Sequence, residues 1–251
     1  MPEHILDLQS VCFTYPDGFQ GIKDISLSVK PGEFILLAGK NGSGKTTLLR
    51  HLNGLLQPDS GDIRVGGKRV CDHLILARKT VGMVFQDADT QIVADTVYDE
   101  VAFGLENLKK DHRTIRSKTV DALEQMNLYD LRDRNPWTLS GGEKRRLAIA
   151  GVLVMDPSVL VFDEPFSNLD YPGARQVLST IVALNTAGHT IIIATHDIET
   201  VIFHATRMII MSDGSIQMDG PPADLIRKLE SFGVREPCSS RLGLGIQPWH
   251  T

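Results

Sequence analysis

The order of apolar segments along the chain predicts an α/β fold built on a mainly parallel sheet. Residues 34–38, 159–162 and 190–195 form short, almost continuous apolar runs, which are typical of strands covered on both faces. After the second run, apolar residues recur over 174–182 at the spacing of an amphipathic helix. Strands that alternate with helices build parallel sheets, because each crossover connection carries a helix back across the sheet.

A small antiparallel β layer is expected beside the parallel sheet. Ile25, Leu27 and Val29 alternate with serines, which is the period of a strand with one buried face. The Pro-Gly pair at 31–32 then favours a turn before the first apolar run. Three further segments have the composition of strands, and they lie at 61–65, 81–85 and 207–211.

The region after the expected strand at 81–85 is predicted to be helical instead. From about 96 to 139 the strand signals stop, and Ile115, Ala122 and Met126 recur at helical spacing. We predict a helical subdomain at about 96–155, inserted into a single domain that spans 1–235. The segment 236–251 is rich in Pro, Ser and Gly and has little periodicity, so we expect a loosely ordered tail.

The charge, cysteines and apolar runs of the chain limit the kinds of partner and cofactor that are expected. The formal net charge of −5 gives no electrostatic reason to expect a nucleic-acid partner. Cys12, Cys71 and Cys238 are widely spaced, which favours reduced thiols over a disulfide framework or a metal site. No apolar run approaches the ~18 residues of a membrane-spanning helix. Any membrane role is therefore expected to depend on a partner protein.

Residues 39–46 read GKNGSGKT and match the phosphate-loop pattern GxxxxGK[ST] at every fixed position. Glycines let backbone N–H groups turn inward around an anion, and the following helix points its positive end at the phosphates. In this pattern Lys45 binds the β- and γ-phosphates, and the Thr46 hydroxyl ligates Mg²⁺. The predicted phosphate-binding residues are Gly39, Asn41, Gly42, Ser43, Gly44, Lys45, Thr46 and Thr47.

Two acids and a histidine follow apolar runs that are predicted to be neighbouring strands. The carboxyl end of a strand faces the ligand crevice of an open α/β sheet. Asp163 can there hold Mg²⁺ through water, and Glu164 can act as general base on a water in line with the γ-phosphate. His196 can donate a hydrogen bond to the same phosphate. A solvated acidic turn and an ordinary loop histidine are the alternative interpretations.

Residues 139–146 read LSGGEKRR and resemble the signature sequence of the ATP-binding cassette (ABC) family. The segment is expected to open a helix and to form a second anion site from the Ser140 hydroxyl and the amides of Gly141 and Gly142. In that family this site faces the nucleotide of the opposite subunit, so that two chains enclose two ATP molecules. The resemblance therefore implies a dimer, with Glu143 also near the nucleotide.

The resemblance extends from about residue 5 to 230, with every motif in the expected order. It implies that Tyr15 stacks on adenine, that Gln86 contacts Mg²⁺ or the attacking water, and that Asp170 lies in the loop crossing the dimer interface. His196 corresponds to the switch histidine. The sequence departs from the family pattern in having Glu143 for Gln, Lys40 for Pro and Asn168 for Ala. None of these changes removes a catalytic group, so a homodimer is expected to hold two competent sites.

Residues 85–91 read FQDADTQ and are followed by TVYDEVAFG at 96–104, which resembles the ATPases of energy-coupling-factor (ECF) importers. This implies an integral membrane coupling protein, a small substrate-binding membrane protein and a location at the cytoplasmic face of the cell membrane. Residues 86–91 are candidates for contacts with the coupling protein. The chain lacks the longer C-terminal extension of some ECF ATPases, which favours cobalt or nickel as cargo, with biotin next.

Other classes of ABC protein remain as alternatives. Soluble ABC ATPases of DNA repair, chromosome structure or translation usually carry a long coiled-coil insertion or two cassettes. The stretch 86–139 is too short for such an insertion, and the chain has one cassette. A different ABC importer or an exporter ATPase stays open. An ATP-hydrolysing transporter subunit is the function that the sequence favours.

Overall fold

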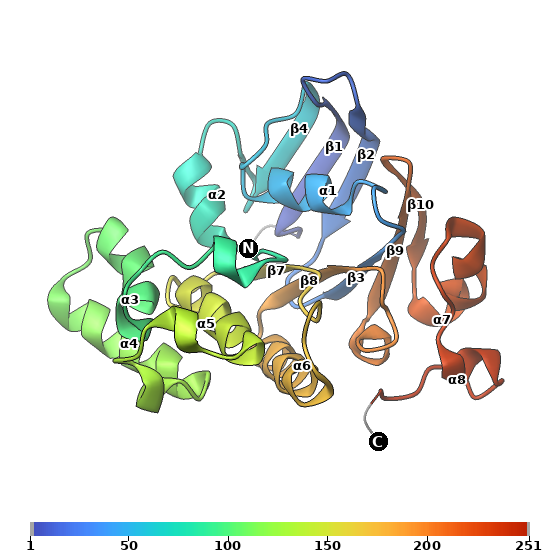
Figure 1. The fold of residues 1–251 in the computed structure, drawn as a ribbon. Helices are drawn as coiled ribbons and strands as arrows, with labels where there is room; N and C mark the ends of the chain where they lie inside the picture. The colour runs from blue at the N-terminus through green and yellow to red at the C-terminus, as the bar shows by residue number, and fades with distance from the viewer. Residues whose placement is uncertain (1–2, 250–251) are drawn as a thin grey trace.

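The computed structural model describes residues 3–249 and contains two sheets, which lie one above the other in Figure 1. The lower sheet has six strands in the order β10-β9-β3-β8-β7-β6, and the upper sheet has four in the order β2-β1-β4-β5. The strands are β1 (Leu6–Thr14), β2 (Gln20–Val29), β3 (Phe34–Ala38), β4 (Ser60–Val65), β5 (Lys68–Arg69), β6 (Val81–Val84), β7 (Val159–Asp163), β8 (Thr190–Thr195), β9 (Arg207–Ser212) and β10 (Ser215–Gly220).

The six-stranded sheet confirms the predicted mainly parallel core. All of its neighbouring strands run parallel except β9 and β10, which form an antiparallel hairpin. Every residue of β3, β7 and β8 is buried, which explains their unbroken apolar composition. Side chains of β3 alternate between two hydrophobic clusters. Leu36 belongs to the cluster on one face of the sheet, and Ile35 and Leu37 belong to the cluster on the other.

The upper sheet confirms the predicted antiparallel layer. Strand β1 lies between β2 and β4 and pairs antiparallel with both. In β2, Ile25, Leu27 and Val29 are buried while Ser26 and Ser28 are not, as their alternation predicts. The sequence analysis did not identify β1, whose register with β2 shifts repeatedly after Leu8.

Helices cover both faces of the parallel sheet. They are α1 (Lys45–Leu52), α2 (Leu74–Thr80), α3 (Val97–Asn107), α4 (His112–Gln125), α5 (Gly141–Leu153), α6 (Tyr171–Thr186), α7 (Pro222–Leu225) and α8 (Cys238–Arg241), with short 3₁₀ segments η1 (Ala88–Thr90), η2 (Tyr129–Leu131), η3 (Pro136–Thr138), η4 (Ile202–His204) and η5 (Ile226–Phe232). Helix α1 lies between the two sheets in Figure 1, and its leucines pack in the cluster that joins them. Helices α5 and α6 pack on the opposite face.

The region predicted as an inserted helical subdomain contains helices and no strand between 97 and 153. Helices α3, α4 and α5 pack on one another to one side of the parallel sheet (Figure 1). Thr96 caps α3 by accepting a hydrogen bond from Asp99 N (3.0 Å), and Asp111 caps α4 through Thr114 N (3.0 Å). Helix α5 also packs against α6, which joins this group of helices to the core.

The segment predicted as a loosely ordered tail makes specific contacts in its described part. Cys238 N, at the start of α8, donates to Glu199 Oε1 (3.2 Å). The Trp249 ring lies 5.0 Å from the Tyr171 ring, between centroids, at the start of α6. Residues 250 and 251 lie outside the described residues. No helix within 3–249 has both the length and the apolarity needed to cross a membrane.

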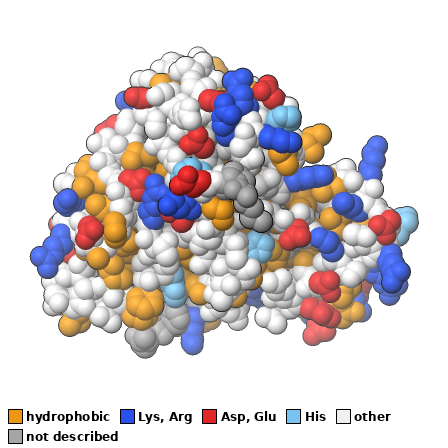
Figure 2. Space-filling model, turned by 180° about the vertical axis from the view of Figure 1, so that it is seen from behind, with side chains coloured by type: hydrophobic (Ala, Val, Ile, Leu, Met, Phe, Trp, Pro, Cys, Tyr) orange, Lys and Arg blue, Asp and Glu red, His pale blue; other side chains and the backbone are white. Residues whose placement is uncertain are grey.

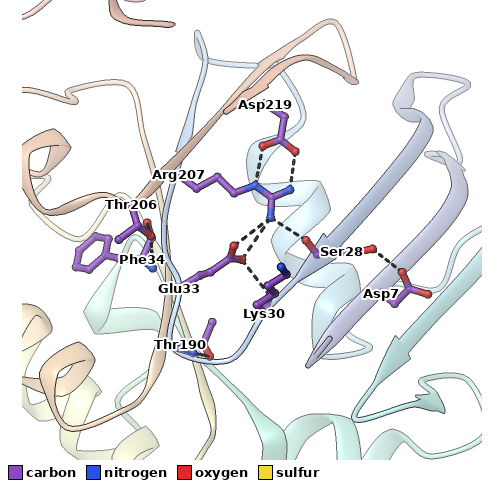
Figure 3. A network of polar contacts seen from close by, with 10 residues as sticks. Asp7, Ser28, Lys30, Glu33, Phe34, Thr190, Thr206, Arg207 and Asp219 are labelled. Carbon is purple, nitrogen blue, oxygen red and sulfur yellow. Dashed lines mark hydrogen bonds and ion pairs between the residues drawn. The ribbon is translucent and has the colours of Figure 1, made fainter. Parts of the chain in front are cut away.

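Arg207 joins the two sheets through the polar network in Figure 3. Its Nε and Nη2 atoms each donate to the Asp219 carboxylate at 2.6 Å, in a bidentate pair between β9 and β10. Its Nη1 atom donates to the Ser28 carbonyl of β2 (2.8 Å) and lies 3.3 Å from Glu33 Oε2. Glu33 also accepts from Lys30 N (3.0 Å). One guanidinium therefore fixes the edge of the parallel sheet against the antiparallel layer.

Candidate nucleotide site

The phosphate loop connects β3 to α1 and has little room for side chains. Gly44 has φ +100°, and a Cβ there would lie 2.7 Å from the Gly21 carbonyl. A Cβ on Gly39 would lie 2.5 Å from both the Met211 carbonyl and Ser43 Oγ. Only glycine fits these positions without displacing neighbouring atoms. The loop leads directly into the first turn of α1, whose free N–H groups favour an anion.

Lys45 is a buried cation at the start of α1. Its Nζ atom donates to the carbonyls of Gly39 (2.6 Å) and Lys40 (3.1 Å), so the side chain folds back over the loop. Burial lowers the pKa of Lys45, and the charges of Glu164 and Asp163 counteract this effect. The ammonium group is thus held close to the two acids that follow β7.

Asp163 ends β7 and is buried beside the phosphate loop. Burial raises the pKa of its carboxyl group, and the Thr46 side chain and Lys45 counteract this. Its Oδ1 atom is buried without a hydrogen-bond partner among the described residues. A buried carboxylate oxygen without a partner is costly, so it is a natural position for a ligand or a bound water. The Thr46 side chain is hydrogen-bonded to the same carboxyl group, so a hydroxyl oxygen lies beside it.

Glu164 is held by the last residue of β8 and by the residue that follows it. It has φ +47°, an uncommon conformation for a residue with a side chain. Its Oε2 atom accepts from Thr195 Oγ1 (2.8 Å), and its Oε1 atom accepts from His196 N (3.0 Å) and lies 2.8 Å from His196 Nδ1. Sequence reasoning identified Glu164 and His196 but missed Thr195. The only signal for Thr195 was its place directly before the histidine.

Most of the predicted nucleotide-binding residues line one cavity of about 370 Å³. The fold brings them together because β3, β7 and β8 are neighbours in the parallel sheet. Gln86, which follows β6, also reaches this cavity. Sequence reasoning missed one member, Phe19. The lining residues are Tyr15, Phe19, Asn41, Gly42, Ser43, Gly44, Lys45, Thr46, Thr47, Gln86, Asp163, Glu164 and His196.

Tyr15 contributes from the antiparallel layer. Its hydroxyl oxygen lies 2.9 Å from Thr47 Oγ1, which connects the aromatic ring to the first turn of α1. The Phe13 ring packs edge-on against Tyr15, with 4.9 Å between centroids and 80° between planes. An aromatic surface is therefore fixed beside the phosphate loop, where a nucleobase attached to bound phosphates can reach it.

The signature residues lie elsewhere. Ser140, Gly141, Gly142, Glu143 and Asp170 line a separate cavity of about 480 Å³, formed where α5 and α6 begin. The fold of one chain does not bring them to the phosphate loop. This separation is what a site shared between two subunits requires.

The Ser140 hydroxyl already has partners within the chain. It donates to Glu143 Oε2 (2.8 Å) and accepts from Glu143 N (3.3 Å), and Ser140 N also donates to Oε2 (2.7 Å). Together these bonds form a capping box at the start of α5. The hydrogen bonds from Ser140 lower the pKa of Glu143. The carboxylate of Glu143, which stands where the family has Gln, is therefore bonded directly to the signature serine.

Arg145 is a residue that sequence reasoning missed. Its side chain is buried, and it donates from Nη1 to the Phe85 carbonyl (2.5 Å) and from Nη2 to the Gln86 carbonyl (2.7 Å). Lys144 bridges to Asp89 (2.8 Å), and Gln91 donates to the Ala148 carbonyl (3.4 Å). The segment 85–91 is therefore bonded to α5, the helix that begins at the signature.

These features together define a phosphate-loop ATPase whose predicted catalytic residues line one cavity and whose signature faces outward. Residues 22–167 match the family model described as ABC transporter. This match spans more than half of the chain, and relatives more than 30% identical cover nine tenths of it. The chain belongs to the ATP-binding proteins of the ABC transporter family, and it is an ATPase whose hydrolysis of ATP powers transport.

Two relatives and one solved structure show which ABC proteins this chain is similar to. The energy-coupling factor transporter ATP-binding protein EcfA of Methanocaldococcus jannaschii is 40% identical over 91% of this chain and 83% of its own length. A relative from Halobacterium salinarum, named only as an ABC transporter ATP-binding protein, is 44% identical over 93% of this chain and 100% of its own. The solved structure of cbiO1 from Clostridium perfringens, part of the ABC transporter complex cbiONQ, has 35% identity and a TM-score of 0.81. That alignment covers 96% of this chain and 98% of cbiO1.

Proposed function

We propose that this chain is the ATPase subunit of an ECF-type importer, at the cytoplasmic face of the cell membrane. The observation that carries the proposal is the segment 85–91, which has the sequence FQDADTQ and is bonded to α5 by Arg145, Lys144 and Gln91. The relative EcfA is named as an energy-coupling factor transporter protein, and the neighbour cbiO1 is named as part of the ABC transporter complex cbiONQ. An ABC importer of another class is the alternative.

Each ATP binds between two chains. The phosphate loop and Tyr15 of one subunit hold the nucleotide, and the signature helix of the second subunit covers its γ-phosphate. The separation of these two cavities within one chain supports this arrangement. Since each chain contains both halves, two identical subunits related by a twofold axis complete two sites. A homodimer is the simplest assembly.

Mg²⁺ fits the oxygen atoms beside the phosphate loop. The Thr46 hydroxyl and the Asp163 carboxylate would hold it, and the unpartnered Oδ1 atom of Asp163 supports this assignment. Mg²⁺ prefers oxygen ligands and is usually bound by one or two carboxylates together with substrate phosphates. When bound, it offsets the negative charge that develops on the β- and γ-phosphates. Gln86, on the wall of the same cavity, is placed to contact this region.

Hydrolysis requires a base for the attacking water, and Glu164 fills this role. Its two oxygens are oriented by Thr195 and His196, so the carboxylate is pre-positioned at the end of the γ-phosphate site. It accepts the proton of the water that attacks phosphorus. His196 lies beside it and donates a hydrogen bond to the γ-phosphate. Lys45 adds positive charge on the phosphates.

A groove on the side of the molecule suits a helix of the coupling protein. It has a volume of about 590 Å³ and is lined by residues of α2, α3 and α5, with Gln91 at one wall. Ile75 and Phe103 are large, exposed apolar side chains in this groove. Exposed apolar surface of this kind is typical of a docking site. Because the groove includes α5 and borders 85–91, a docked helix would move with the signature.

The proposed cargo rests on the resemblance of this sequence to the ATPases of ECF importers. Cobalt or nickel is proposed first and biotin second, as expected for a dedicated ECF system. The ATPase does not contact the cargo in such a system, so its own residues favour none of the three directly. The membrane partner that recognises the cargo decides this question.

The first test is isolation of the tagged protein from its native cells in mild detergent, followed by mass spectrometry. A multi-helix coupling protein together with a small membrane protein would support the proposal. Recovery of soluble partners or ribosomes alone would overturn the transporter assignment and leave the ATPase intact. Phe103→Asp should abolish the capture, while Phe203→Asp, an equally exposed phenylalanine outside the groove, should not.

A second test identifies the cargo. Cells expressing the recovered membrane partners with this ATPase would be given radioactive cobalt, nickel or biotin in turn. Uptake that requires the native ATPase and fails with Glu164→Gln identifies the substrate. Uptake of biotin alone would replace the metal assignment and keep the ECF assignment.

A further inference from the structure

Phe19 is an aromatic residue on the wall of the nucleotide cavity that the phosphate-loop and signature motifs do not explain. Its side chain is 58% exposed, yet it lines the same cavity as Tyr15 and the phosphate loop. A single exposed phenylalanine on a protein surface needs no explanation. At the edge of a ligand cavity, however, the same ring presents apolar surface to whatever enters.

Tyr15 and Phe19 lie opposite each other across the turn between β1 and β2. Tyr15 N donates to the Phe19 carbonyl (2.8 Å), directly after the ladder pair of Thr14 and Gln20. Residues directly opposite in an antiparallel pair project to the same face. Their ring centroids are 6.3 Å apart and their planes differ by 31°. The two rings therefore lie side by side and form a wider surface than either ring alone.

The turn that carries the two rings is held in place. Phe19 N donates to Asp17 Oδ1 (3.0 Å), and Gly18 N donates to the Tyr15 carbonyl (2.9 Å). Tyr15 is further fixed by Phe13 and by the contact of its hydroxyl with Thr47. A surface ordered in advance binds a flat ligand at a lower entropic cost than a mobile one.

We propose that Phe19 and Tyr15 together form a two-ring platform on which the base of ATP stacks. Phe19 thereby acts as a binding residue for the nucleobase, and its absence would weaken the affinity for ATP. Aromatic bases stack in offset geometry on aromatic side chains, and a wider platform gives the base more contact. The proposal rests on the assignment of this cavity as the nucleotide site.

Calorimetric titration of the full chain with ATP and with inorganic tripolyphosphate tests the platform. Phe19→Ala should weaken ATP binding about 5- to 20-fold, because stacking on one ring contributes a factor of this order. Tripolyphosphate has no base, so its affinity should change less than about twofold. Phe19→Tyr keeps a ring at the position and should restore ATP binding. Phe203→Ala is the matched control, since Phe203 is 47% exposed and lies outside the cavity.

A second variant reports the contact directly. In Phe19→Trp, ATP should quench the fluorescence of the introduced indole, and tripolyphosphate at the same occupancy should not. An ATP affinity unchanged by Phe19→Ala, or no quenching at saturating ATP, would contradict the platform. Lys45→Ala separates this failure from failure of the site itself. If Lys45→Ala weakens ATP while the Phe19 variants have no effect, only the platform is wrong; if neither residue matters, the nucleotide site lies elsewhere.

Discussion

The nucleotide cavity and the signature surface differ in how complete they are within one chain. The cavity gathers an aromatic ring, the phosphate loop, two acids and a histidine from neighbouring strands. The signature surface offers helix N–H groups and the Ser140 hydroxyl but no base and no phosphate-binding lysine. On the proposed arrangement, one subunit would bind ATP by itself, whereas hydrolysis would require two. Substitutions in the two regions should therefore have different consequences.

Replacing the proposed base should have the largest effect. Glu164→Gln keeps the size of the side chain but cannot accept a proton, so hydrolysis should fall about 10²- to 10⁴-fold. ATP binding should persist, and the ATP-bound dimer should accumulate because it cannot turn over. Phosphate release and size-exclusion chromatography with ATP measure the two effects. Turnover close to that of the native protein would refute the role of Glu164.

Removing the lysine of the phosphate loop should act on binding instead. Lys45→Ala removes a buried cation close to Asp163 and Glu164 and should weaken ATP binding about 10- to 150-fold. Equilibrium titration of the isolated subunit measures this without a partner. An unchanged affinity would contradict the assignment of the cavity.

A change on the signature surface should spare ATP binding by the isolated subunit. Ser140→Ala should reduce hydrolysis about tenfold and weaken ATP-dependent dimerisation, because the second anion site loses its hydroxyl. It also removes the cap of α5, which costs about 1 kcal/mol of unfolding free energy. Asp111→Ala removes the equivalent cap of α4 and controls for that loss. Equal effects of both variants on dimerisation would mean that the surface acts only through stability.

Arg145 bonds the signature helix α5 to the segment that carries Gln86, and this link between the two regions can be tested. Arg145→Met leaves the carbonyls of Phe85 and Gln86 without their partner and should slow hydrolysis about tenfold, with little change in ATP affinity. Lys144→Met breaks the bridge to Asp89 and the contact of the ammonium with the Trp137 ring, and hydrolysis should stay within about twofold. Steady-state kinetics of both variants, checked by thermal melting, decide the outcome. Equal rates for the two variants would exclude a role for Arg145 in coupling.

The smallest effect is expected at Glu143. Its carboxylate lies on the surface that would approach the triphosphate of the partner subunit, so Glu143→Gln should strengthen ATP-dependent dimerisation about two- to fivefold. The pKa of Glu143 is lowered by hydrogen bonds from Ser140, so the carboxylate is charged above its ordinary value of 4.5. The capping-box hydrogen bonds of the Glu143 carboxylate contribute their full stabilisation to the fold above pH 4.5, its ordinary pKa. This stabilisation is lost as the pH falls through the lowered pKa of the folded protein. Sedimentation of both proteins with ATP at neutral pH checks the difference.

Sequence reasoning predicted the structure correctly where the residue types of a short segment determine its local fold. Strands β3, β7 and β8 are buried on both faces, which leaves continuous apolar runs, and the phosphate loop requires glycine at positions where a Cβ would collide. Strand β1 was missed because its bulges interrupt the alternation of buried and exposed residues.

The missed site residues depend on contacts between distant parts of the chain. Arg145 reaches carbonyls about 60 positions away in sequence, and in a helix rich in basic residues nothing distinguishes it as buried. Thr195 is important only because β7 and β8 are neighbours, which brings Glu164 within hydrogen-bond distance. Phe19 lies in a turn, where an aromatic residue has no periodic pattern to mark it.

The Arg207 network has a consequence for the release of product. The aromatic rings belong to the antiparallel layer and the phosphate loop to the parallel sheet, and Arg207 fixes these layers to each other (Figure 3). A base stacked on these rings and phosphates bound in the loop would therefore lie on layers that Arg207 joins, and ADP would meet the same contacts as ATP apart from those to the lost phosphate. Acidic and basic side chains are interspersed over the face of the molecule in Figure 2. In the proposed dimer, ADP would leave when the two subunits separate, and the lifetime of the dimer would set the pace of the cycle.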